Sequence, residues 1–193
     1  RQAAAAGLAG FAVNWSGTGN SAQTITDSVY SRRLKAMVDA VHKVNSEGIP
    51  FTLWLSYKAS AKTLSTAAIL GDLGFFLAKY GKDSAFDRTM TSKPTVIWQG
   101  SRKYPVSVLA AVNEKYRSAL RLIGDEKTWS TGRAPYLDGD AYYWSSQNPW
   151  ANPQSFGQLA TLARAVRASG PNPDGSAKIW VASAAPGFDT QLA

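Results

Sequence analysis

Residues 51–57 read Phe-Thr-Leu-Trp-Leu-Ser-Tyr, and apolar side chains occupy both odd and even positions of this stretch. A strand with one solvated face alternates apolar and polar residues, so this run predicts a strand covered on both faces, as parallel strands are. The segment before it has apolar residues at three- and four-residue steps, from an expected N-cap at Thr26 to Gly48 and Pro50, which end the helix. A helix followed directly by such a strand indicates an α/β fold with a parallel sheet.

The same alternation of helix and strand patterns runs through the rest of the chain. We expect six strands, at residues 10–15, 51–57, 94–99, 120–124, 136–144 and 178–183. Further helices are expected over residues 64–80, 108–119 and 156–166. A parallel sheet of this kind is either doubly wound or closed as a barrel. Neither G-x-G-x-x-G nor a P-loop joins a strand to a helix, since Gly17-Thr18-Gly19 lacks the third glycine.

The absence of these phosphate-binding motifs favours a (β/α)-barrel of the TIM type. Such a barrel has eight strands and usually about 250 residues, whereas we expect six strands in the 193 residues of this chain. Residues 1–193 are therefore predicted to form a single barrel domain that is incomplete, with about six of eight strands present and the rest missing at one or both ends.

Composition excludes several classes of protein. Hydrophobic residues make up 45% of the chain, too many for a disordered protein, and no apolar run approaches the roughly 20 residues that a bilayer helix needs, so no membrane insertion is expected. Without cysteine there is no thiolate metal site or thiol nucleophile, and His42 is the one histidine that a serine triad could use. Oxygen ligands with calcium-loop spacing are also missing, so we expect no metal and no cofactor.

The net charge of +8 raises the question of an anionic polymer as partner. The densest basic groups are Arg32, Arg33 and Lys35 in a helical pattern and the pair Arg102 and Lys103, with no longer run of like charges. A solvated basic surface explains this spread equally well, so we expect no specific nucleic-acid binding and keep binding of an anionic polymer as the least favoured alternative.

Aromatic, amide and carboxylate residues stand at the ends of the expected strands. In a parallel barrel these ends meet on one face, where active sites lie, and rings beside hydrogen-bonding groups suit sugars. The candidate substrate-binding residues are Asn14, Trp15, Tyr57, Gln99, Asp125, Glu126, Asp138, Asp140, Tyr143 and Trp144. Each has a plainer alternative: the aromatic rings in a core, Asp125 and Glu126 in a solvated loop beside Lys127, and the Asp-Gly pair in a turn or bulge.

Three segments resemble related barrel glycoside hydrolases that include endo-α-mannosidases and α-1,3-glucanases. These segments are residues 5–15, which read Ala-Ala-Gly-Leu-Ala-Gly-Phe-Ala-Val-Asn-Trp, residues 136–144, which contain Asp138-Gly139-Asp140, and residues 185–189, which read Ala-Pro-Gly-Phe-Asp. Their order and spacing match those of the family over almost the whole chain. The resemblance implies a barrel in which they belong to an early, a late-middle and the penultimate strand.

The chain departs from that family at the catalytic motif. Those enzymes carry a Trp-Asn-Glu or Trp-Asn-Asp motif on the strand after the Pro-Gly segment, with a second glutamate just beyond it. Here the nearest match, Asn113-Glu114, falls inside a helical pattern, so we expect the catalytic carboxylates beyond Ala193 and name no catalytic residue.

The resemblance implies a secreted or cell-surface glycoside hydrolase acting on α-linked oligosaccharides or polysaccharides. We expect this segment alone to be inactive and prone to self-association, and the whole protein could carry further carbohydrate-binding domains. A catalytically inactive carbohydrate-binding barrel is the main alternative.

Overall fold

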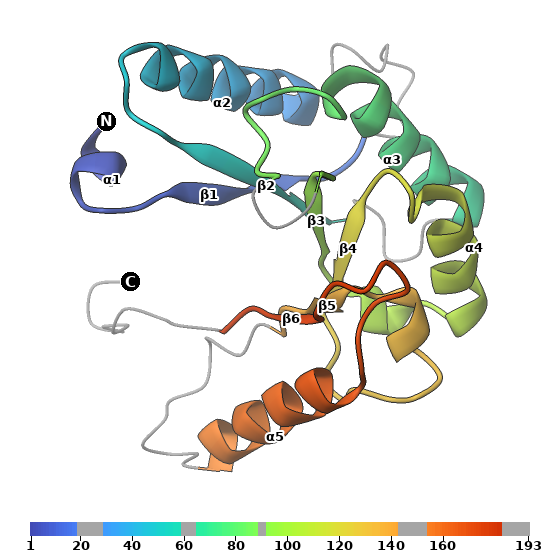
Figure 1. Cartoon of the computed structure of the whole chain (residues 1–193). Helices are drawn as coiled ribbons and strands as arrows, with labels where there is room; N and C mark the ends of the chain where they lie inside the picture. Colours follow the sequence, from blue (N-terminus) through green and yellow to red (C-terminus); the bar gives the residue numbers. More distant parts are fainter. Residues whose placement is uncertain (19–28, 59–64, 89–91, 143–153, 183–193) are drawn as a thin grey trace, which may run out of the picture.

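The computed structural model describes residues 1–18, 29–58, 65–88, 92–142 and 154–182. Its centre is a sheet of six strands that pair in the order of the chain, and every pair is parallel (Figure 1). The strands are β1 (Gly10–Trp15), β2 (Thr52–Tyr57), β3 (Thr95–Trp98), β4 (Arg121–Gly124), β5 (Gly139–Asp140) and β6 (Ile179–Trp180). The predicted parallel sheet is confirmed, and its order lacks the reversal at which doubly wound folds bind nucleotides.

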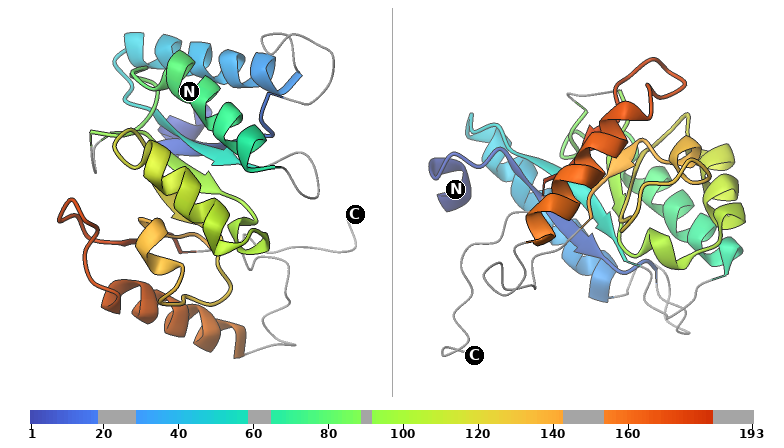
Figure 2. Two further views of the ribbon diagram at one scale, coloured as in Figure 1. Left: turned by 90° about the vertical axis from the view of Figure 1, so that its right-hand side faces the viewer. Right: turned by 90° about the horizontal axis from the view of Figure 1, so that it is seen from below.

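The longer helices lie on the convex side of this curved sheet, whereas a short one, α1 (Gln2–Ala5), lies beyond the amino end of β1 (Figures 1 and 2). The longer helices are α2 (Val29–Ser46), α3 (Thr66–Tyr80), α4 (Val106–Tyr116) and α5 (Gln154–Ala168), with single 3₁₀ turns η1 (Ser101–Lys103) and η2 (Ala134–Tyr136). The hydroxyl of Ser65 caps α3 by accepting a hydrogen bond from the Ala68 N–H. Thr26, the expected cap of α2, lies outside the described residues.

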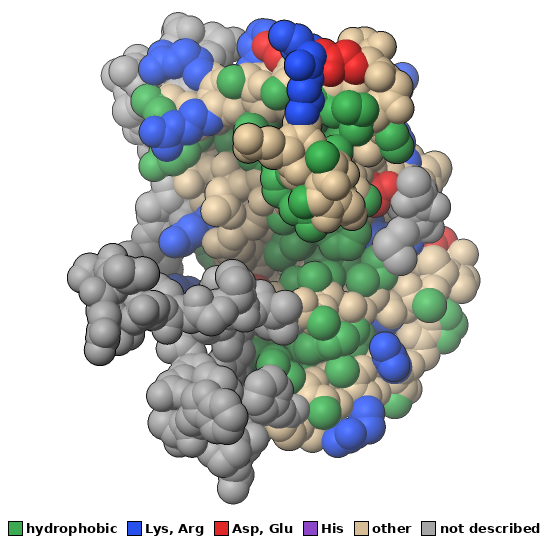
Figure 3. Space-filling model, turned by 90° about the vertical axis from the view of Figure 1, so that its left-hand side faces the viewer, with side chains coloured by type: hydrophobic (Ala, Val, Ile, Leu, Met, Phe, Trp, Pro, Cys, Tyr) green, Lys and Arg blue, Asp and Glu red, His purple; other side chains and the backbone are tan. Residues whose placement is uncertain are grey.

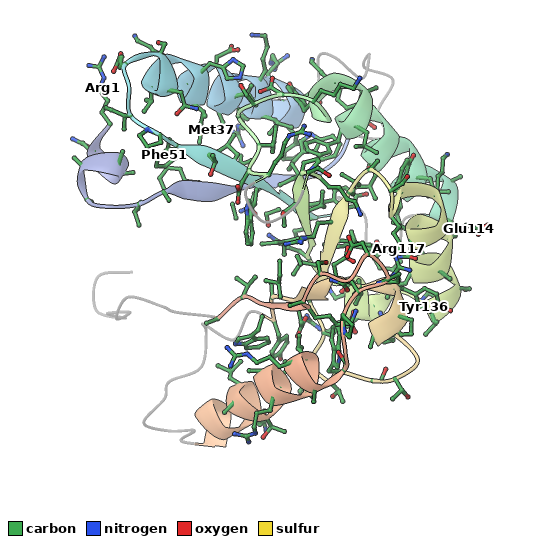
Figure 4. The ribbon with its side chains drawn as sticks, viewed as in Figure 1. Arg1, Met37, Phe51, Glu114, Arg117 and Tyr136 are labelled. Atoms are coloured by element: carbon green, nitrogen blue, oxygen red, sulfur yellow. The ribbon has the colours of Figure 1, made fainter. Side chains whose placement is uncertain are left out.

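Pairing in register divides the strand residues between two faces of the sheet. Successive side chains point to opposite faces, and residues in register across parallel strands share a face. Leu53, Leu55 and Tyr57 have no exposed surface and belong to one hydrophobic core with residues of α2, α3 and α4. We call this side the helix face; Met37 of α2 and Phe51 point into its packing layer (Figure 4). The opposite side is the inner face.

The later strands differ from the sequence expectation. Residues 136–144 were expected to form one strand, but among the described residues of this stretch β5 comprises only Gly139–Asp140, and Tyr136 belongs to the 3₁₀ turn η2 together with Pro135, which has no N–H for a sheet ladder. The helix expected to reach residue 119 ends at Tyr116. An isolated parallel bridge joins Leu53 to Phe86, and no sequence pattern had indicated it.

Strands β1 and β6 form the two edges of the sheet. Both lie on the side where the sheet is open, and among the described residues no strand joins them (Figure 1). Figure 3 looks at this open side and shows hydrophobic side chains gathered in its middle. In the described part of the chain, no helix is both long and apolar enough to cross a bilayer.

The amino end of the sheet is held by Lys178, just before β6. Its ammonium donates to the Ala134 and Leu137 carbonyls at 3.0 and 2.7 Å and to the Asn172 side-chain oxygen at 2.9 Å. These bonds use all three donors of the ammonium group. Burial lowers the pKa of Lys178. This residue therefore ties together the segments that lead into β5 and β6.

Candidate functional site

The division between faces separates the expected site residues into two groups. Asn14 pairs with Ser56, and Ser56 with Ile97, so all three share the inner face, as does Gln99 two residues further on. Ile97 pairs with Ile123, which places Asp125 on the same face by the same alternation. The inner face at the carboxyl ends of the strands thus holds three of the expected residues, Asn14, Gln99 and Asp125.

A row of polar side chains crosses β1, β2 and β3 on the inner face. The Gln99 Nε2 donates to Asn14 Oδ1 at 2.8 Å and also to the Ser56 hydroxyl oxygen. Asn14 is exposed, while Ser56 is 5% exposed at the base of the row. Among the described residues, the side-chain oxygen of Gln99 (Oε1) and the side-chain nitrogen of Asn14 (Nδ2) have no hydrogen-bond partner. The row therefore offers an acceptor and donors to a ligand.

Asp125 continues this row beyond the end of β4. Its Oδ2 accepts a hydrogen bond from the Gly100 N–H at 2.7 Å and lies 2.6 Å from the Arg102 guanidinium. The Arg102 guanidinium in turn lies 5.4 Å from the ring centre of Tyr142. The Asp125 Oδ1 is buried without a hydrogen-bond partner among the described residues. The negative charge of Asp125 is thus compensated, and one acceptor atom is unused.

Glu126 follows Asp125 but lies in the layer between the sheet and the loops. The side chain is 3% exposed, and Arg133 binds it with Nε 2.7 Å from Oε2 and Nη2 3.1 Å from Oε1. Its Oε1 also accepts a hydrogen bond from the Ser101 hydroxyl at 2.6 Å. With both oxygens bound to the protein, Glu126 holds loops together, and its expected contact with substrate is not supported.

Asp140 is a fully buried carboxyl group at the end of β5. Its Oδ1 accepts a hydrogen bond from the Glu126 N–H at 2.8 Å, and its Oδ2 has no partner among the described residues. Burial raises the pKa of Asp140 to about 8, with the charges of Glu126 and Asp125 acting in the same direction. The group is therefore mainly protonated at neutral pH. Because it pairs in register with Gly124 on the helix face, it does not face the row on the inner side.

Trp15 and Tyr57 form part of the core. Both have no exposed surface and pair in register on the helix face, with their rings 5.7 Å apart. Trp15 also stacks on Phe75 of α3 at 6.2 Å. The Tyr57 hydroxyl donates to Asp72 of α3 at 2.8 Å. Their expected role as sugar platforms is wrong, because the last residue of each strand points towards the helices rather than the inner face.

Asp138 lies at the opposite end of the strands from its expected position. It precedes β5, and its carboxylate accepts a hydrogen bond from the Leu122 N–H at 2.7 Å near the start of β4. The side chain lines a small hollow with residues of α4 such as Asn113 and Tyr116. The expectation that it lies at the carboxyl ends is wrong, because β5 comprises only Gly139–Asp140 and Asp138 stands just before its first residue. The Asp138 carboxylate instead accepts a hydrogen bond from a backbone N–H of the sheet.

Three further sequence expectations concern residues 143, 144 and 183, the pair Asn113-Glu114, and a metal. Tyr143, Trp144 and Ser183, the last of which we expect at the carboxyl end of the last strand, lie outside the described residues, so their expected positions stay predictions. The pair Asn113-Glu114 lies within α4, as its helical pattern indicated, and Glu114 points away from the sheet (Figure 4). Within the described ranges, no group of three acidic or histidine side chains could hold a metal ion.

Sequence reasoning missed Ser101 and Arg133 and did not give Arg102 a role in the site. Arg133 binds the carbonyls of Ser101 and Tyr104, which lie 32 and 29 positions earlier in the chain. No local pattern connects such distant residues. The only available signal was that a basic residue, Arg133, follows the acidic pair Asp125-Glu126 within one loop. No protein-family model and no curated protein matches this sequence.

Proposed function

We propose that this chain is the sugar-binding part of a glycoside hydrolase with a (β/α)-barrel of the TIM type, acting on α-linked oligosaccharides or polysaccharides. The observation that carries the proposal is the polar row of Asn14, Ser56 and Gln99 on the inner face, beside Asp125. Six parallel strands paired in chain order, with helices on the outer side, support the barrel. The row occupies the end of such a sheet where barrel enzymes bind their substrates.

The chemistry of the row suits hydroxyl groups. An amide side chain both donates and accepts hydrogen bonds, as a sugar hydroxyl does, so neither partner needs to be charged. Gln99 is held by two bonds through its nitrogen, which fixes the direction of its carbonyl oxygen. A fixed acceptor costs a ligand less ordering entropy than a mobile side chain would.

Cleavage of a glycosidic bond normally needs two carboxyl groups, one on each side of the bond. Of the carboxylates that we expected at the site, only Asp125 lies on the inner face, and Arg102 neutralises it. The described residues are therefore assigned to binding rather than to bond cleavage. This same observation favours the second candidate function, a catalytically inactive carbohydrate-binding barrel.

Calorimetric titration with α-1,3-gluco-oligosaccharides and α-manno-oligosaccharides tests the proposal. Gln99→Ala should weaken binding by about 1 to 3 kcal/mol, because a buried sugar hydroxyl would lose its partner. The matched control is Gln158→Ala on the exposed side of α5, which should leave the affinity unchanged. Equal affinity of the Gln99 variant and the wild type would refute the site.

Release of reducing ends separates the two candidate functions. Turnover of either glycan by a protein that contains this chain supports the hydrolase. Binding that depends on Gln99, without turnover, supports the inactive carbohydrate-binding barrel.

A further inference from the structure

A partly buried arginine joins the two loops that surround Asp125. The side chain of Arg133 is 15% exposed. Its Nη1 donates a hydrogen bond to the Tyr104 carbonyl and its Nη2 donates one to the Ser101 carbonyl, each at 2.9 Å. The same guanidinium also forms a bidentate ion pair with both carboxylate oxygens of Glu126. One side chain therefore binds both the loop after β3 and the loop after β4.

This network continues to Asp125 through Ser101. The Ser101 hydroxyl donates to Glu126 and accepts a hydrogen bond from the Asp125 N–H at 2.8 Å. The neighbouring Gly100 N–H binds the Asp125 carboxylate. The turn at Gly100 and Ser101 thus holds both the backbone and the side chain of Asp125, and Arg133 fixes this turn.

The energetic cost of burying the Arg133–Glu126 ion pair indicates what the pair contributes. Removing two charges from water costs several kcal/mol per ion, and well-packed apolar residues of similar volume often serve stability equally well. What apolar residues cannot supply is the direction of four hydrogen bonds from one planar group. The Arg133–Glu126 pair therefore contributes the geometry of the two loops.

We propose that Arg133 is a positioning residue that keeps the Asp125 carboxylate in place on the inner face by fixing the turn at Gly100 and Ser101. The role of Asp125 in sugar contact rests on the proposed function. The coupling between Arg133 and Asp125 does not, and it can be measured without a ligand.

Amide hydrogen exchange on the full chain tests this coupling. In Arg133→Ala, the amides of Gly100 and Asp125 should exchange at least tenfold faster, while the strand amides of β3 and β4 keep their rates. Ethylguanidinium added to this variant should slow both amides again, because it restores the missing group. Arg1→Ala, which breaks the exposed pair with Glu47, is the matched control and should change neither amide.

Two results would overturn the coupling: unchanged exchange at Gly100 and Asp125, or an equal acceleration of the strand amides, which would make Arg133 a general stability element. Titration with the two oligosaccharides forms a separate arm. If the wild type binds them, Arg133→Ala should bind at least fivefold more weakly and recover with ethylguanidinium, and unchanged affinity would refute the positioning role. If the wild type binds neither sugar while the two amides respond locally, the proposed function fails and the coupling stands.

Discussion

Replacing Asp140 with asparagine should stabilise the protein at alkaline pH. The pKa of Asp140 is raised from its ordinary value of 3.8 to about 8 by burial and by the nearby acids. In the unfolded chain the group ionises near its ordinary pKa, so the folded state binds more protons between pH 4 and pH 8. Stability from this group is complete below about pH 4 and is lost as pH rises to about 8.

The size of this effect follows from the difference between the two pKa values. Each pKa unit is equivalent to about 1.4 kcal/mol, so Asp140 lowers the free energy of unfolding by roughly 5 kcal/mol at pH 8 relative to pH 4. Asparagine keeps the acceptor for the Glu126 N–H and carries no charge. Its buried amide nitrogen costs about 1 to 3 kcal/mol where it lacks an acceptor. We therefore expect a net gain of about 3 kcal/mol at pH 8.

Urea unfolding followed by tryptophan fluorescence, at several pH values from 4 to 9, measures this gain. The quantity to compare is the variant minus the wild type at each pH, because the titration of all other groups then largely cancels. The difference should be about −1 to −3 kcal/mol at pH 4, where only the cost of the buried amide remains, and should rise to about +3 kcal/mol at pH 8. A difference that does not change with pH would refute the assignment of Asp140 as a buried neutral acid.

Four further substitutions test the two faces of the sheet, its amino end and the backbone at Gly17. Trp15→Ala should cost about 3 to 5 kcal/mol of unfolding free energy in urea, since the ring is fully buried, whereas Asn14→Ala should stay within about 0.5 kcal/mol; equal losses would contradict the two faces. Lys178→Met should cost about 1 to 3 kcal/mol in the same assay because buried acceptors lose their donor, and wild-type stability would show that the ammonium is not needed. Gly17→Ala should lower the melting midpoint by the equivalent of more than about 1 kcal/mol, because its φ of +80° is strained with a Cβ and that Cβ would overlap the Asp72 carboxylate; an unchanged midpoint would argue against this backbone.

The sequence pattern predicted the strands better than it predicted the site. Apolar runs such as residues 51–57 are long and end at turn-forming residues, so the order of strands and helices could be predicted. In a run that is apolar at both odd and even positions, however, nothing in the pattern shows which set packs on helices. The rings of Trp15 and Tyr57 were therefore expected beside Asn14 and Gln99, although they lie on the opposite face.

The acidic residues show a second limit of the sequence pattern. Asp125, Glu126, Asp138 and Asp140 form similar pairs in the sequence, yet their side chains have four different surroundings. These surroundings depend on partners such as Ser101 and Arg133, which sequence periodicity does not connect. A resemblance in short motifs carried no information on that packing.

The three bonds of Lys178 have a consequence for how this protein can be altered. They occupy two backbone carbonyls of the segment that enters β5 and the side-chain oxygen of Asn172 in the segment that enters β6, so substitutions at the amino end of the sheet affect folding first. At the other end, Asn14 is exposed and Gln99 is partly exposed, and neither belongs to the hydrophobic core. A mutant library directed at Asn14 and Gln99 should therefore retain most of its folded members, whereas one directed at the surroundings of Lys178 should lose most of them before any selection for binding begins.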